Sequence, residues 1–276
     1  MGQTSGRPEI VIALIDGPVL MQPAALWSTR VRQSGGKLPM TCQYSSSAAC
    51  MHGTFVASIL AAKRSSGAPA ICPDCTLLVR PIFPESDSNS REMPTATPEA
   101  LAEAILDAIR GGASVLNLSV SVAEPSLAGY SQLEQALNYA ASRDVVVIVA
   151  AGNQGAIGNS ALTSHPWAIP VVACDDAGRP LPDSNLSASI GKNGLTAPGM
   201  NIPVLGADAT LSRMSGTSAS APFVAGTAAL LRSLFPRATA SAVKLALTQT
   251  RAGERRSLVP RLLDASAAYQ VLAAAA

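Results

Sequence analysis

The chain has 276 residues, 48% of them hydrophobic, and a formal net charge of +2 at pH 7. This length and hydrophobic content allow a large core, and α/β folds of this size often form a single domain. Charged residues make up only 14% and are scattered, so nothing indicates binding to nucleic acid or a membrane surface. No apolar run has the length of a membrane span. The short polar start, residues 1–8, lacks a signal-peptide core, and we therefore expect a cytoplasmic protein.

Apolar runs typical of buried strands alternate with segments of helical periodicity along the chain. Strands are expected over 9–15, 76–82, 114–120, 145–151 and 169–174, and helices over 51–63, 99–110, 131–142, 227–234, 241–250 and 263–272. Residues 19–49 are expected to form surface loops with one short helix, and residues 187–198 a hairpin. Pro81 is expected to limit the pairing of its strand. The alternation predicts an α/β fold with a doubly wound, mainly parallel sheet and helices on both faces. Because no long linker interrupts it, we expect one domain over 1–276, with a core of about 9–250.

Two polar residues stand at places where an active site would be expected. The first strand ends at Asp16, and open α/β sheets bind ligands at the carboxyl ends of their strands. An Asp before Gly is also a common turn residue. Of the two histidines, His52 lies at the entrance of an apolar helix and is followed by Gly53. His165 precedes another strand, where packing or a loop hydrogen bond is expected.

A run of small residues from Ser215 to Gly226 opens a further helix. In its Gly-Thr-Ser turn, Ser218 lies beside the free N–H groups and positive dipole end of that helix, an environment that favours an oxyanion. The alternative is that Thr217 or Ser218 only caps the helix. Asn153 follows a buried strand, where Asn-x-Gly is also an ordinary turn.

Together these segments resemble the motifs of the subtilisin-like serine proteases, the subtilases. In that family Asp, His and Ser occur in this order, and Gly-Thr-Ser-x-Ser/Ala-x-Pro leads into a buried helix. The resemblance covers about residues 9–250. It implies that Asp16, His52 and Ser218 form a catalytic triad and that Asn153 donates to the oxyanion.

The implied activity is that of a serine endopeptidase working through an acyl-enzyme. His52 would take the proton of Ser218 while Asp16 holds the imidazole, and no metal or organic cofactor would be needed. The peptide substrate is expected to lie along the ends of two strands, at Ser119, Val120, Ser121, Ala151 and Gly152. Ser121 and Val122 replace glycines usual in digestive subtilases, which implies restricted specificity unless the loop runs another way. We find no dense Asp and Asn cluster for calcium.

Two short segments, Asp16 to Val19 and Val79 to Phe83, resemble the subgroup of subtilases that matures ribosomal peptides of the cyanobactin type. That resemblance implies a precursor peptide as substrate. The subgroup's macrocyclising members carry a helical cap, for which the segment between Asp16 and His52 is too short, so hydrolysis is expected over cyclisation. The alternatives are a transpeptidase or macrocyclase of the same fold, and an inactive subtilase that binds peptides.

Four cysteines flank the expected His52 helix, namely Cys42, Cys50, Cys72 and Cys75, and Cys174 stands apart. Four thiols, two of them in a Cys-x-x-Cys pair, permit a zinc site, two disulfides or free cysteines. The sequence leaves all three states open.

Overall fold

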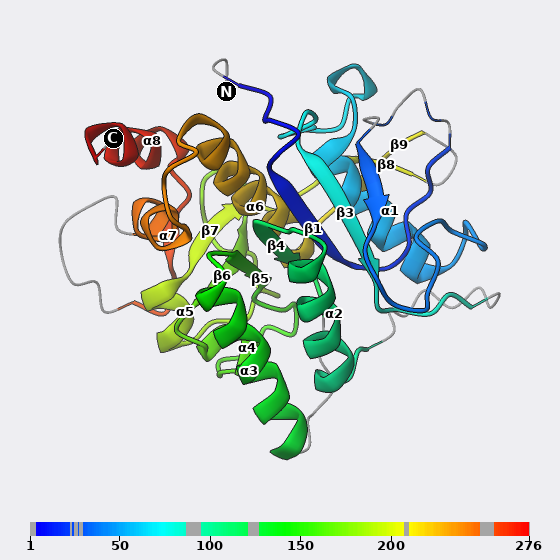
Figure 1. Ribbon diagram of the computed structural model, residues 1–276. Coiled ribbons are helices and arrows are strands. Elements are labelled where there is room, and N and C mark those ends of the chain that lie inside the picture. The colour runs from blue at the N-terminus through cyan, green and yellow to red at the C-terminus, as the bar shows by residue number, and fades with distance from the viewer. Residues whose placement is uncertain are drawn as a thin grey trace.

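The structure is a computed structural model that describes residues 4–22, 24, 27, 30–86, 95–120, 127–206, 210–248 and 257–275, with only the backbone for 127–129. Its centre is an eight-stranded sheet in the order β10-β7-β6-β5-β4-β1-β3-β2 (Figure 1). All neighbouring strands of this sheet are parallel. They are β1 (Val11–Asp16), β2 (Val31–Gln33), β3 (Thr76–Pro81), β4 (Val115–Leu118), β5 (Val146–Ala150), β6 (Ala168–Cys174), β7 (Leu195–Pro198) and β10 (Arg261–Leu262).

Helices cover both faces of the sheet (Figure 1). One face packs against α1 (Ala48–Ala61), α6 (Thr217–Leu234), α7 (Ala240–Thr248) and α8 (Ala265–Ala275), and the other against α2 (Pro98–Arg110) and α3 (Leu127–Ser142). The short helices are α4 (Ala161–Ser164), α5 (Ala188–Asn193) and the 3₁₀ turn η2 (Arg64–Ser66). This arrangement confirms the predicted doubly wound, mainly parallel α/β fold.

The continuous apolar sequence of β1 follows from its burial on both faces. Ile12 and Leu14 pack in the core beneath α1 and α6, whereas Val11, Ala13 and Ile15 pack beneath α2. Successive side chains of a strand point to opposite faces, so a strand covered on both sides needs apolar residues at every position. All six residues of β1 are buried, including Asp16.

The structure differs from the sequence prediction in several local details. α1 begins at Ala48, four residues before His52, because Ser47 caps it by accepting a hydrogen bond from the Cys50 N–H at 3.1 Å. Residues 19–49 contribute strand β2 at the sheet edge as well as loops. Pro81 is the last residue of β3, so β3 still pairs with both β1 and β2.

The hairpin predicted over 187–198 is wrong. Ser187 accepts a hydrogen bond from the Ile190 N–H at 3.2 Å and starts α5, and the chain then enters β7 beside β6. Cap chemistry and a parallel partner therefore outweigh the local Gly-Lys-Asn-Gly turn signal. The antiparallel hairpin in the described chain is instead β8 (Ile202–Leu205) with β9 (Leu211–Met214), which the sequence did not reveal.

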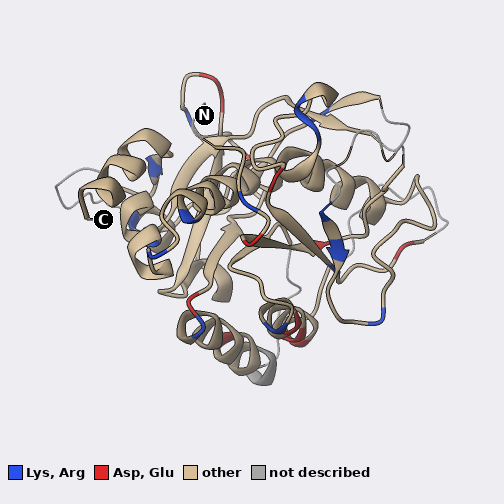
Figure 2. Ribbon diagram, turned by 45° about the horizontal axis from the view of Figure 1, so that its top comes forward, with Lys and Arg blue, Asp and Glu red and all other residues tan. Residues whose placement is uncertain are grey.

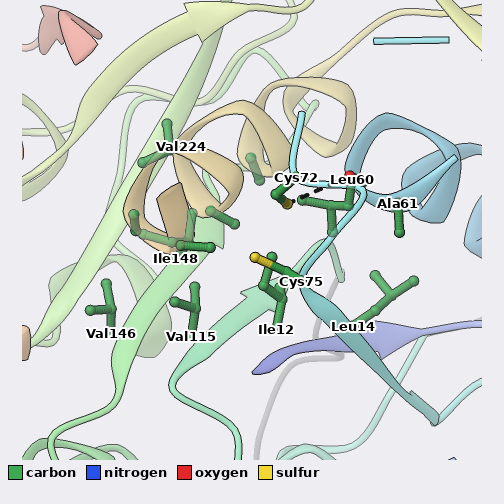
Figure 3. Packing of buried hydrophobic residues seen from close by; sticks show 14 of the residues in the cluster. Ile12, Leu14, Leu60, Ala61, Cys72, Cys75, Val115, Val146, Ile148 and Val224 are labelled. Carbon is green, nitrogen blue, oxygen red and sulfur yellow. Dashed lines mark hydrogen bonds between the residues drawn. The ribbon is translucent and has the colours of Figure 1, made fainter. Parts of the chain in front are cut away.

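The cysteines take two of the states that the sequence left open. Cys42 and Cys50 form a disulfide immediately before His52. Cys72, Cys75 and Cys174 are free and buried. Figure 3 shows Cys72 and Cys75 in the core, where the Cys72 thiol donates to the Leu60 carbonyl at 3.5 Å. A hydrogen bond with Cys75 and burial together raise the pKa of the Cys72 thiol well above its usual value, which keeps it protonated.

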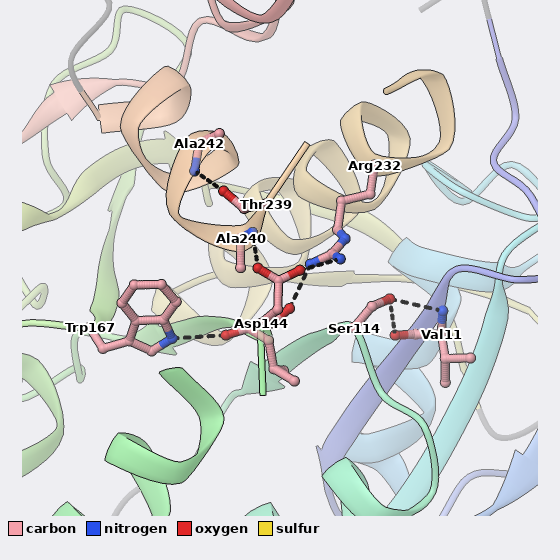
Figure 4. A network of polar contacts seen from close by, with 9 residues as sticks. Val11, Ser114, Asp144, Trp167, Arg232, Thr239, Ala240 and Ala242 are labelled. Carbon is pink, nitrogen blue, oxygen red and sulfur yellow. Dashed lines mark hydrogen bonds and ion pairs between the residues drawn. The ribbon is translucent and has the colours of Figure 1, made fainter. Parts of the chain in front are cut away.

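A polar network holds the C-terminal half of α6 (Figure 4). The carboxylate of Asp144 accepts from Arg232 at 2.8 Å and from the Ala240 N–H at 2.6 Å, and Arg232 also donates to the Asp144 carbonyl at 2.7 Å. These bonds join the turn before β5, the end of α6 and the start of α7. The helix that carries Ser218 is therefore tied to the sheet at its far end.

Charges elsewhere are dispersed. Figure 2 shows acidic and basic residues interspersed along the ribbon, in keeping with 20 Lys and Arg against 18 Asp and Glu. Within the described residues, no helix combines the length and the apolar character needed to cross a membrane.

Candidate functional site

Three neighbouring strands end at one edge of the sheet and deliver most of the predicted site residues there. They are β5, β4 and β1, which are adjacent in the sheet and parallel. Asp16 ends β1, Ser119 and Val120 follow β4, and Ala151 to Asn153 follow β5. Residues far apart in the sequence therefore meet at the carboxyl edge of the sheet.

Asp16 and His52 form a close hydrogen-bonded pair. Asp16 Oδ1 lies 2.7 Å from His52 Nδ1 and also accepts from the Gly17 N–H at 2.7 Å. The Asp16 side chain is fully buried and that of His52 is 15% exposed. This geometry makes Nδ1 the protonated nitrogen and leaves Nε2 as the proton acceptor.

Two glycines bring α1 against the chain that follows β1. A Cβ on Gly53 would lie 2.5 Å from the Gly17 carbonyl oxygen, and one on Gly17 would lie 2.0 Å from the Ala49 carbonyl oxygen. Any side chain at either position would push the helix away from the strand end. The Asp16–His52 distance therefore depends on the glycine that follows each of the two residues.

Asp16 also controls the protonation of His52. Burial alone would lower the pKa of His52, but the negative charge of Asp16 and its hydrogen bond outweigh burial and raise that pKa above its usual 6.5. The imidazole is therefore a stronger base than a free histidine side chain.

Ser218 is the second residue of α6 and is partly exposed. Pro222 lies four residues later and lacks the N–H that would bond to the Ser218 carbonyl in a regular helix. The buried Ser119 hydroxyl donates to that carbonyl instead, at 3.4 Å, and accepts from Asn117 Nδ2 at 2.9 Å. The segment that follows β4 therefore holds the backbone of Ser218. Within the described part of the chain, no hydrogen bond joins Ser218 Oγ to His52.

Asn153 is oriented by Thr217. Its side-chain oxygen accepts from the Thr217 N–H at 2.8 Å and from Thr217 Oγ1 at 3.0 Å, and Thr217 Oγ1 accepts from the Gly152 N–H at 3.2 Å. Because both donors face the oxygen, the amide NH₂ of Asn153 remains available for a ligand. The first N–H groups of α6, which include that of Ser218, have no acceptor within the helix. The arrangement suits an anion beside Ser218.

The remaining predicted residues have different outcomes. Ser119, Val120 and Ala151 are buried at the strand ends, so they can offer a peptide mainly backbone groups. Gly152 is half-buried, and Ser121 lies outside the described residues. His165 makes the expected loop contact, because its Nδ1 accepts from the Trp167 N–H at 3.2 Å.

The described residues hold one group with metal-ligand geometry, formed by Cys42, Cys50 and Glu85. Its two sulfurs are joined in the disulfide and are therefore not thiolate ligands. The Glu85 carboxylate instead accepts hydrogen bonds from the Gln43 and Tyr44 N–H groups at 2.8 and 3.0 Å. These bonds fix the position of the loop before α1.

Sequence reasoning missed two residues that support the site. The sequence indicates Thr217 only as a helix cap, although this residue lies within the Gly-Thr-Ser motif. Asn117 is fully buried in β4, and a polar residue inside an otherwise apolar strand was the signal that would have found it.

Comparison with known proteins agrees with this geometry. The profile of the subtilase family matches residues 25–266. The protease domain of PatA, the patellamide maturation protease, was solved as a serine-to-alanine mutant and is 30% identical, with a TM-score of 0.86 over 100% of this chain and 99% of that one. The prenylagaramide maturation protease PagA is 29% identical, with a TM-score of 0.79 over 98% of this chain and 96% of that one.

A curated relative extends further than this chain. An alkaline protease of Alkalihalobacillus alcalophilus is 33% identical over 186 residues, which are 67% of this chain but 45% of the relative. The chain therefore spans less than half the length of that relative. The family profile nevertheless matches most of the chain, and the protein belongs to the subtilase family.

Proposed function

We propose that the protein is a serine endopeptidase in which Ser218 attacks the peptide carbonyl. The observation that carries this proposal is the 2.7 Å hydrogen bond between the buried Asp16 and the partly exposed His52, at the sheet edge where α6 presents Ser218. A carboxylate that fixes a histidine tautomer beside a serine at a helix start is the arrangement used for acyl transfer.

The steps follow from the named groups. His52 Nε2 takes the Ser218 proton as Oγ bonds to the carbonyl carbon, and the carbonyl oxygen becomes an oxyanion. The Asn153 NH₂ and the Ser218 N–H stabilise that oxyanion. His52 then gives the proton to the leaving amine, the C–N bond breaks, and water hydrolyses the acyl-enzyme by the same route. Asp16 stabilises the imidazolium in both halves.

We propose a leader-bearing precursor peptide as the substrate. PatA and PagA are both maturation proteases, and the similarity to each extends over nearly the whole of the compared chains. The buried Ser119 and Val120 present the substrate mainly with backbone groups, which hold an extended peptide without selecting its sequence, so the proposed restriction to a precursor peptide rests on the similarity to the maturation proteases.

The test compares the native protein with Ser218→Ala by mass spectrometry of short peptides and a leader-bearing precursor peptide. We expect cleavage at one position by the native protein and none by the variant. Ser142→Ala is the matched control, because Ser142 is exposed at the end of α3, far from the sheet edge.

Other products would change the conclusion. A product lighter by one water than the linear fragment would identify a macrocyclase, in which an amine replaces water in the second step. Peptide binding by both forms without any cleavage would overturn the protease proposal in favour of an inactive binding protein.

A further inference from the structure

Asn185 holds the residues on both sides of Asn153. The Asn185 N–H donates to the Gly152 carbonyl at 3.0 Å, and Asn185 Oδ1 accepts from the Gln154 N–H at 3.1 Å. The same oxygen accepts from the Ala156 N–H at 3.0 Å, and Asn185 Nδ2 donates to Gln154 Oε1 at 2.7 Å. One residue on the loop after β6 therefore binds the turn after β5 through four hydrogen bonds.

The shape of the turn matches this contact. Gly152 has φ +102°, a conformation that favours glycine, and a Cβ there would lie 2.4 Å from Asn185 Nδ2. The Asn185 amide therefore fills the space beside the Gly152 backbone. Further along, the Gly155 N–H donates to the Asp183 carbonyl at 2.7 Å and the Leu186 N–H to the Ala156 carbonyl at 3.0 Å, so the two loops run together.

Packing cannot supply this support, because Asn153, Gln154 and Ala156 are exposed. Thr217 fixes the side-chain end of Asn153, whereas Asn185 fixes the backbone on either side of it. We propose that Asn185 is a positioning residue that preorganises Asn153 for the oxyanion, an inference that rests on the proposed protease function. It touches neither Ser218 nor His52 among the described contacts and acts through Asn153.

Preorganised donors contribute most where charge develops, and a small misplacement of such a group costs up to about 100-fold in rate. Asn185→Ala removes the acceptor of two backbone N–H groups. We expect kcat to fall about 10- to 100-fold with KM nearly unchanged, because the substrate is bound before the oxyanion forms.

The matched control is Gln154→Ala, which removes only the side-chain acceptor of Asn185 Nδ2 and leaves both bonds to Asn185 Oδ1 in place. We expect it to stay within a few-fold of the native kcat. Asn185→Ser keeps a short acceptor, and we expect an intermediate kcat. It replaces Asn185→Ala in every measurement if that variant does not fold.

A double-mutant cycle with Asn153→Ala separates positioning from a general structural role. If Asn185 acts through Asn153, its substitution has little further effect on kcat once the Asn153 amide is gone. Independent multiplication of the two losses, a rise in KM without a fall in kcat, or an unchanged kcat would each overturn the inference.

A second readout uses the aldehyde of the peptide that the native protein cleaves. Ser218 Oγ adds to its carbonyl carbon and forms a hemiacetal whose oxygen occupies the oxyanion position. We expect Asn185→Ala to weaken aldehyde binding by the same factor as kcat and to leave binding of the product peptide unchanged. If the native protein cleaves nothing, the proposed function fails. If it cleaves and these losses are absent, only the role of Asn185 fails.

Discussion

The two sides of the candidate site are held in place by different kinds of interaction. Asp16 and His52 lie on a strand end and a helix, and the Asp16 carboxylate is fully buried. Asn153 lies on an exposed turn whose position depends on hydrogen bonds that Thr217 donates to Asn153 and that Asn185 accepts from the Gln154 N–H. The buried side is set by regular structure and close backbone packing, whereas the exposed side is set by a few polar side chains. Substitutions on the two sides should therefore fail in different ways.

The largest effect is expected from Asp16→Asn on the buried side. The substitution keeps the size of the side chain but removes the charge that selects the tautomer and stabilises the imidazolium. We expect kcat to fall about 10⁴-fold. Steady-state kinetics with a peptide that the native protein cleaves measures the fall. A loss below 10-fold would show that the Asp16–His52 bond is structural only.

The pH dependence of kcat/KM tests whether the charge of Asp16 raises the pKa of His52. Neutral His52 is the required base, so kcat/KM should rise with pH through a midpoint above 6.5, because Asp16 raises the pKa of His52. In Asp16→Asn the charge is gone and burial remains, and burial lowers that pKa. The midpoint of the residual activity should therefore move to lower pH. A midpoint that moves upward would contradict the assignment.

A smaller effect is expected on the exposed side, from Asn153→Ala. Loss of one oxyanion donor costs about 10²- to 10³-fold in kcat with little change in KM. Asn159→Ala is the matched control, because Asn159 is an exposed asparagine of the same loop whose side chain bonds to Ser189. Equal losses in both variants would point to the loop as a whole rather than to the Asn153 amide.

The contrast also explains what the sequence could predict. The sequence predicts Asp16, His52 and Ser218 because each adjoins a contiguous signal: an apolar strand, a helical apolar pattern, or the small-residue motif. Residues Gly191 to Gly194 wrongly indicated a turn. The structure has a helix capped by Ser187 there, followed by a strand that pairs with β6.

Asn185 had no local signal at all. Its partners lie about 30 residues earlier, and its neighbours Asp183 and Ser184 look like an ordinary turn. The pairing of Cys42 with Cys50 was equally invisible, since it depends on where the loop before α1 places the two sulfurs. Long-range polar contacts between loops are therefore the part of the site that only the structure reveals.

The disulfide extends the comparison to stability. Cys42 and Cys50 are 8 residues apart, and Glu85 independently holds the loop between them. Loop-closure entropy for so short a loop corresponds to about 2.5 kcal/mol. The double variant Cys42→Ser, Cys50→Ser should lower the free energy of unfolding by about that amount, measured by urea denaturation, and reduction of the native protein should match it. If the reductant lowers the stability of the double variant as much as that of the native protein, the loss does not come from the Cys42–Cys50 disulfide.

The smallest effect is expected from Ser119→Ala, in the segment that follows β4, the strand that ends between the two sides. The Ser119 hydroxyl donates to the Ser218 carbonyl, which receives no hydrogen bond from within the helix because Pro222 has no N–H. Removing the hydroxyl also leaves the buried Asn117 amide without its acceptor. We expect a loss of about 1 to 2 kcal/mol in the free energy of unfolding and a fall in kcat of a few-fold, as the backbone of Ser218 loosens.

Ser233→Ala is the matched control for that substitution. Ser233 is also a buried serine that donates to a carbonyl of α6, that of Ala229, at 2.8 Å. In a regular helix the Ala229 carbonyl already accepts from the N–H four residues later, so removing the Ser233 hydroxyl leaves it paired. We therefore expect a smaller loss of stability and an unchanged kcat. Equal losses in the two variants would mean that α6 responds to any lost hydroxyl, and that Pro222 creates no special demand for Ser119 beside the nucleophile.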